Sequence, residues 1–104
     1  MYVSIVEYSI GNIDEVQWAD ACRELAPAFA TVPGLVAKYW LHGQAAIRGG
    51  VYIWSDIAAY RAFLKSDVAR TMGSHPNISH LTMRQYAVDE VPTQVTRGML
   101  VARG

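Results

Sequence analysis

The sequence predicts an α+β protein of the ferredoxin-like kind, in which the order βαββαβ gives a four-stranded antiparallel sheet with two helices on one face. Four runs rich in β-branched and aromatic residues predict strands, and two segments repeat apolar residues at helical spacing. The 104 residues, 52% of them apolar and 17% charged, fit one domain spanning residues 1–104.

The first strand and helix are expected in the first third of the chain. A β-rich run at Tyr2–Ser9 predicts the strand, and Gly11 follows it as a breaker. Asn12 with Glu15 three residues later has the pattern of a helix cap with its capping-box partner. Pro27 lies inside the helical pattern, so we expect it to kink or restart the last turn.

The next elements form a hairpin and a second helix. Strands at Leu35–His42 and Arg48–Trp54 are joined by a short loop of small residues, which predicts an antiparallel pair. Ser55 or Asp56 can cap the second helix, which we expect to break near Ser66.

The fourth strand is expected at Ser79–Val88, with Pro92 ending it. Residues 91–104 are too few for a domain. Because they include Met99-Leu100-Val101, we expect a C-terminal arm lying on an apolar surface.

Alternation divides the predicted strands into two faces, neither of which resembles a solvent-facing surface. The odd positions are aliphatic: Val3, Ile5, Ala37, Leu41, Val51, Ile53, Leu81 and Met83. The even positions are aromatic with ionisable groups: Ser4, Val6, Tyr8, Lys38, Trp40, His42, Tyr52, Trp54, His80, Arg84 and Tyr86. Because two helices cover only one face, we predict a homodimer that packs sheet against sheet.

Composition argues against several classes of protein. Nine basic and nine acidic residues leave no net charge, which disfavours a nucleic-acid or membrane-surface binder. No segment resembles a signal peptide or a membrane span, so we expect a cytoplasmic protein. The lone Cys22 forms no internal disulfide, and no His or Cys spacing predicts a metal site.

RNA-recognition modules share this order of elements and stack bases on sheet aromatics. Their third-strand motif begins like Arg48–Trp54, but Gly50 stands where a stacking aromatic is needed and Ser55 replaces the last one. We therefore expect no nucleic-acid partner.

Several stretches resemble one family in their order and spacing. They are Val32-Pro33-Gly34-Leu35, Lys38-Tyr39-Trp40, Gly49-Gly50-Val51-Tyr52-Ile53-Trp54-Ser55-Asp56, Val88-Asp89-Glu90-Val91-Pro92 and Val95-Thr96-Arg97-Gly98. Together they are similar to the YdhR-type mono-oxygenases of the dimeric α/β-barrel superfamily, relatives of the antibiotic-biosynthesis mono-oxygenases. The resemblance implies a homodimeric barrel with a ligand cavity between sheet and helices in each protomer. His42 departs from the family, which often has an acidic residue there.

The implied activity is cofactor-independent mono-oxygenation of an electron-rich aromatic or polyketide-like small molecule. Such chemistry needs a base, a group that holds an oxyanion, and flat walls. Lys38 can serve as base or oxyanion partner, Arg84 as a fixed cation, and His42 or His80 as a base. The expected substrate contacts are Trp40, Tyr52, Trp54, Tyr8, Tyr86 and Phe63. The structural alternatives are that Lys38 extends to solvent, Arg84 pairs with an acid, and the aromatics form an ordinary core.

A non-oxidative cyclase, an isomerase or a small-molecule binding protein fits the same fold. The cyclase type uses a tyrosine and a histidine on the second helix, where this chain has Phe63 and Ala69. Haem-degrading barrels use a helix histidine with a tryptophan and an asparagine. His75 could match the first, but the second helix has no tryptophan and the first strand no asparagine, so we expect no haem.

Overall fold

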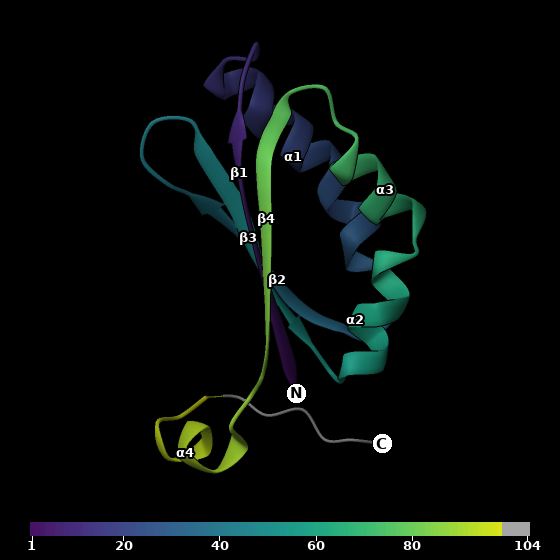
Figure 1. The fold of residues 1–104 in the computed structure, drawn as a ribbon, viewed down its shortest axis with the longest axis vertical. Helices are drawn as coiled ribbons and strands as arrows, with labels where there is room; N and C mark the ends of the chain where they lie inside the picture. Colours follow the sequence, from purple (N-terminus) through teal and green to yellow (C-terminus); the bar gives the residue numbers. More distant parts are fainter. Residues whose placement is uncertain (99–104) are drawn as a thin grey trace.

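The computed structural model describes residues 1–98 and confirms the predicted order of elements. The strands are β1 (Tyr2–Ile10), β2 (Leu35–His42), β3 (Ile47–Trp54) and β4 (Ile78–Ala87), and they pair antiparallel in the order β2-β3-β1-β4. The helices are α1 (Glu15–Ala30), α2 (Ile57–Leu64), α3 (Asp67–Gly73) and α4 (Glu90–Val95). Figure 1 shows α1, α2 and α3 on one face of the sheet and α4 beyond the end of β4. Of the predicted arm at residues 91–104, the described part includes most of α4, where Val91 and Val95 are exposed, and the remainder from residue 99 on lies outside the described residues.

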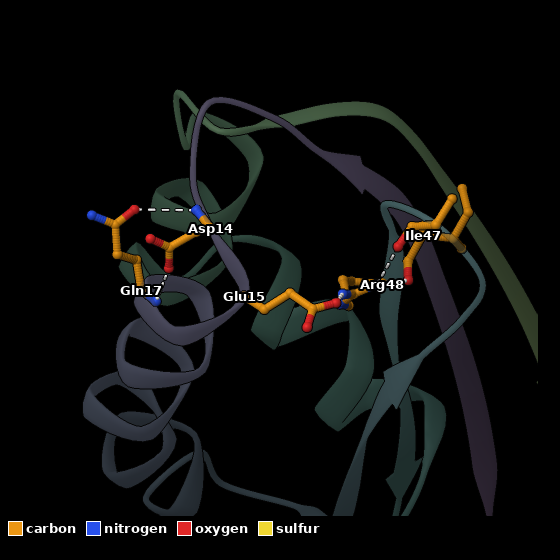
Figure 2. Close-up of polar contacts among 6 residues, drawn as sticks. Asp14, Glu15, Gln17, Ile47 and Arg48 are labelled. Carbon is orange, nitrogen blue, oxygen red and sulfur yellow. Dashed lines mark hydrogen bonds and ion pairs between the residues drawn. The ribbon is translucent and has the colours of Figure 1, made fainter.

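Helix α1 begins later than its sequence pattern suggested. Its cap is Asp14, whose carboxylate accepts a hydrogen bond from the Gln17 backbone N–H at 2.8 Å (Figure 2). The Gln17 side-chain oxygen in turn accepts from the Asp14 N–H at 3.1 Å. The predicted capping box of Asn12 and Glu15 is therefore wrong. Asn12 instead forms a turn with a φ of 58°, a left-handed conformation that a short amide side chain tolerates.

The sequence predicted interruptions of the helices at Pro27 and near Ser66. Pro27 does not restart α1, which continues through it to Ala30. The Arg23 carbonyl loses its helical donor there, but both residues are exposed and water can satisfy it. The second helix breaks as expected, because the Ser66 hydroxyl donates to the Phe63 carbonyl and also caps α3 by accepting from the Ala69 N–H.

Strand β4 carries a bulge that the sequence analysis did not anticipate. Its pairing with β1 shifts register between Glu7 and Ser9, and His80 in this stretch has a φ of 55°. An extra residue in one strand reverses its alternation from that point onward.

The two faces of β4 are consequently opposite to the prediction. Arg84 lies across from Ile5 on the aliphatic face, and Tyr86, two residues further, points the same way. Leu81 and Met83 face the helices and line a cavity beneath α3. The predicted faces are wrong for β4, whereas the pairings of β1, β2 and β3 keep the predicted ones.

The core between sheet and helices is mainly aromatic. Trp54 is fully buried, and its indole N–H donates to the Ser4 hydroxyl at 2.9 Å. Tyr52 stacks on Trp54 with ring centroids 5.9 Å apart. The buried cluster consists of Tyr8, Trp18, Phe29, Tyr52, Trp54, Tyr60, Phe63 and Met72.

The other face of the sheet is mainly apolar, although Glu7, Thr82 and Arg84 also lie on it. Figure 1 shows no helix over it among the described residues. Its partly buried side chains are Val3, Ile5, Ala37, Val51 and Ile53, and its exposed ones include Tyr39, Leu41 and Tyr86. Within residues 1–98, no helix is both long and apolar enough to cross a membrane.

Candidate functional site

Three cavities border the Trp40 ring on the helix-covered side. One of about 360 Å³ lies between α1 and α3, and one of about 350 Å³ lies between α1 and the β2–β3 hairpin. These two also share Trp18 and Cys22, so they adjoin. A third, of about 320 Å³, opens at the β2 edge beside Lys38. Each is within the size range of small-molecule sites, which starts at roughly 300 Å³.

Lys38 is enclosed by aromatic rings. Its Nζ lies 3.4 Å from the Phe29 ring centroid, 3.5 Å from that of Trp40 and 4.7 Å from that of Tyr52. Among residues 1–98, no carboxylate forms an ion pair with it. Burial lowers the pKa of Lys38 from 10.5 to about 7. The amine therefore exists in both neutral and charged forms near neutral pH.

Two predicted substrate contacts are tyrosines that border cavities. Tyr8 lines the 350 Å³ cavity, and both Tyr8 and Tyr52 line a fourth cavity of about 260 Å³ beneath α2 and α3. Burial raises the pKa of Tyr8 to about 12, and it raises the pKa of Tyr52 as well. Both hydroxyls therefore stay protonated and can donate a hydrogen bond.

The other predicted aromatic contacts differ in position. Trp40 borders three cavities, and Phe63 lines the 260 Å³ cavity. Trp54 has 0% of its surface exposed and borders none of these four cavities, so it belongs to the core. Tyr86 is on the opposite face of the sheet and does not reach them.

The four predicted catalytic side chains are not brought together. Lys38 and His42 lie on the helix-covered face, and His42 is at the exposed end of the 350 Å³ cavity. His80 is exposed at the bulge, with Nδ1 3.1 Å from the Ser79 hydroxyl, and borders none of the four cavities. Arg84 is on the aliphatic face because of the bulge.

Sequence reasoning missed Arg48, a buried cation at the 350 Å³ cavity. Its side chain is 5% exposed. Its Nη1 donates to the carbonyls of Ala45 and Ile47 at 3.0 and 2.7 Å, and its Nη2 lies 3.4 Å from a Glu15 carboxylate oxygen (Figure 2). Arg48 pairs with Tyr8 and occupies an even position, so the alternation that placed Tyr52 also placed Arg48 on this face.

Cys22 and His75 lie at the 360 Å³ cavity. Burial raises the pKa of the Cys22 thiol, so it remains protonated and is a poor nucleophile. The His75 ring packs edge-on against Trp18 at 5.7 Å, and its Nδ1 accepts from the Asn77 N–H at 3.2 Å. Within the described range, no three His, Cys, Asp or Glu side chains are grouped as a metal ion would require.

Comparison with known families gives a match over most of the chain. The model described as putative mono-oxygenase ydhR matches residues 6–99, which is most of the chain. No curated protein matches the sequence significantly.

Solved structures share the fold. A putative antibiotic biosynthesis monooxygenase from Deinococcus radiodurans superposes with a TM-score of 0.73 at 17% identity, covering 88% of this chain and 95% of that one. A mutant of SnoaB, a cofactor-independent oxygenase from Streptomyces nogalater, has a TM-score of 0.68 at 13% identity, covering 86% and 94%. MhuD, a heme-degrader from Mycobacterium tuberculosis, has a TM-score of 0.66 at 17% identity, covering 86% and 96%. At these identities the likeness shows the fold alone.

Proposed function

The chain belongs to the ydhR mono-oxygenase family, and we propose that it oxidises an electron-rich aromatic or polyketide-like small molecule with dioxygen and without a bound cofactor. The observation that carries the proposal is the Lys38 amine, held among three aromatic rings beside the cavities at Trp40. SnoaB, which shares the fold, is described as a cofactor-independent oxygenase, and this supports the same class of chemistry here.

Direct reaction with dioxygen requires an electron-rich substrate, and a phenol or enol becomes one when it loses a proton. A conjugated methylene group can then be oxidised to a carbonyl. One oxygen atom enters the product, the other leaves as water, and the substrate supplies all four electrons. No external reductant is needed for this balance.

Lys38 can provide the acid–base step. Its neutral amine accepts the phenolic proton, and the resulting ammonium stays beside the anion. The anion favours the charged amine, so its binding raises the pKa of Lys38 again. Because the neutral amine predominates above about pH 7 in the free protein, kcat/KM limited by proton removal should rise with pH through that value.

The test is dioxygen uptake with a panel of phenols and anthrone-type compounds in chelator-treated, flavin-free buffer. For at least one compound, we expect one molecule of substrate to be oxidised and one molecule of water to form for each dioxygen consumed. Lys38→Met should lower the rate about 100-fold or more, since general-base catalysis contributes roughly 10²–10⁴-fold. Lys65→Met, which alters the other lysine of the chain, should retain the rate. Product formed equally fast without dioxygen would instead support a cyclase or isomerase.

We further propose that the protein is a homodimer whose protomers pack through the open face of the sheet. The support for this proposal is the open face itself, where Val3, Ile5, Val51 and Ile53 lie side by side on β1 and β3. No described helix covers these side chains (Figure 1). A second copy of the chain would supply the missing layer.

A further inference from the structure

Arg48 carries a buried charge that its own chain only partly neutralises. Its side chain is 5% exposed, and removing a guanidinium from water costs several kcal/mol unless an anion compensates it. The carbonyls of Ala45 and Ile47 satisfy Nη1 but carry no charge. Among the described residues, its ion-pair partner is Glu15, through one 3.4 Å contact to Nη2.

The contact between Glu15 and Arg48 is weak enough for another anion to replace the Glu15 carboxylate. Guanidinium–carboxylate hydrogen bonds are usually about 2.7–2.9 Å long and often bidentate, so a single contact at 3.4 Å is weak. The Glu15 side chain is also 79% exposed, which lets its carboxylate turn into water at little cost.

Arg48, in contrast, is held in place. Its two carbonyl contacts fix the guanidinium against the β2–β3 turn, as Figure 2 shows for Ile47. The next residue, Gly49, packs so closely on β1 that a Cβ there would lie 2.1 Å from the Val6 carbonyl oxygen. The backbone that carries Arg48 is therefore in close contact with β1, with which it also pairs.

The cavity beside Arg48 suits a flat molecule with one anionic end. Trp18 and Trp40 supply aromatic walls, and Tyr8 supplies a hydroxyl. Burial raises the pKa values of Tyr8 and Cys22 on this lining, so neither adds a negative charge near neutral pH. The carboxylate on the lining is that of Glu15, whose side chain is exposed.

We propose that Arg48 binds a carboxylate of the small-molecule substrate in place of Glu15, while the aromatic part of that molecule lies against Trp18 and Trp40. This inference rests on the proposed function and narrows its substrates to electron-rich aromatic molecules that also carry a carboxylate. Glu15 then occupies the site in the free protein and lowers affinity by competition.

The experiment measures binding, not turnover, by titrating the full chain with 1-naphthoate and with the neutral 1-naphthamide. Wild type should bind the naphthoate more tightly. Glu15→Gln should raise naphthoate affinity about 3–10-fold and leave naphthamide affinity unchanged. Asp20→Asn, which removes the same charge from an exposed position of α1, should change neither. Arg48→Met should weaken naphthoate binding about tenfold or more, with little effect on the amide.

Several results would overturn the inference. Equal wild-type affinity for the two ligands, or no binding of either, contradicts an anion site. Equal effects of Glu15→Gln and Asp20→Asn would mean a general electrostatic effect. Equal loss of both ligands in Arg48→Met would mean that Arg48 only fixes the hairpin. Because no oxidation is measured, these results are independent of whether dioxygen uptake succeeds.

Discussion

A lysine on an edge strand can extend into solvent or fold back over the sheet, and Lys38 does the second. Alternation along β2 was enough to predict its face, because the β2–β3 register places it across from Tyr52. The enclosure could not be predicted in the same way, since the Phe29 ring beside Nζ comes from α1. Its low pKa is thus a product of tertiary packing.

Burial of this amine makes stability depend on pH. Lys38 has a pKa of about 7 in the folded protein against 10.5 for the ordinary amine. Below pH 7 both states are protonated, and the buried charge costs stability. Between pH 7 and 10.5 the unfolded chain binds more protons, so the free energy of unfolding should rise with pH.

Lys38→Met removes that buried charge. We expect it to raise the free energy of unfolding by about 1–3 kcal/mol at pH 6, and by much less at pH 10. Urea denaturation at the two pH values measures this. Lys65→Met, at an exposed position, should stay within about 0.5 kcal/mol of wild type. If Lys38→Met raised the free energy of unfolding equally at both pH values, the amine would not be buried among the aromatic rings.

At the scale of elements, the alternation of side chains along the sequence predicted the correct faces for β1, β2 and β3 but not for β4. The β1 and β3 pairing runs from Tyr2 to Ser9 without a shift, so polar and apolar positions mark the faces correctly. In β4 the bulge adds a residue. A glycine at the bulge would have indicated a positive φ in the sequence, but the residue with that conformation is His80. Arg84 was therefore assigned to the wrong face, although the strand itself was predicted.

The start of α1 offers a test of the same kind. Both Asn12 and Asp14 have cap-forming side chains, and three-dimensional geometry selects Asp14. Asp14→Ala should lower the free energy of unfolding by about 0.5–2 kcal/mol. Asn12→Gly should be neutral within about 0.5 kcal/mol, because glycine accepts the positive φ. If Asn12→Gly were the more harmful change in thermal or urea unfolding, the assigned cap would be wrong.

At the scale of the whole molecule, both faces of the sheet carry mainly apolar side chains. The described helices that pack on the sheet cover only one of them (Figure 1). The sequence predicted this imbalance from its odd and even positions, and the described fold retains it for β1, β2 and β3. The cavities, in contrast, depend on how α1 and α3 rest on the sheet. Arg48 was missed for that reason, since its value as a site residue lies in the Glu15 contact and in the cavity beside it.

The proposed dimer predicts a selective effect of charge on the open face. Ile5→Lys, at the centre of that face on β1, should convert the dimer to a monomer in sedimentation equilibrium. Val16→Lys, on the helix-covered side, where Val16 is 71% exposed, should leave the dimer intact. A wild-type chain that sediments as a folded monomer at micromolar concentration would contradict the proposed interface.

The central claim is that Lys38 is the acid–base group of a ligand cavity, and ¹³C NMR of lysine methylene carbons tests it most directly because the chain has two lysines. We expect the Lys38 resonance to titrate with a pKa of about 7 in the free protein and at higher pH once a phenolic ligand is bound. A resonance that titrates at the ordinary lysine value, unchanged by every phenol tried, would contradict the account.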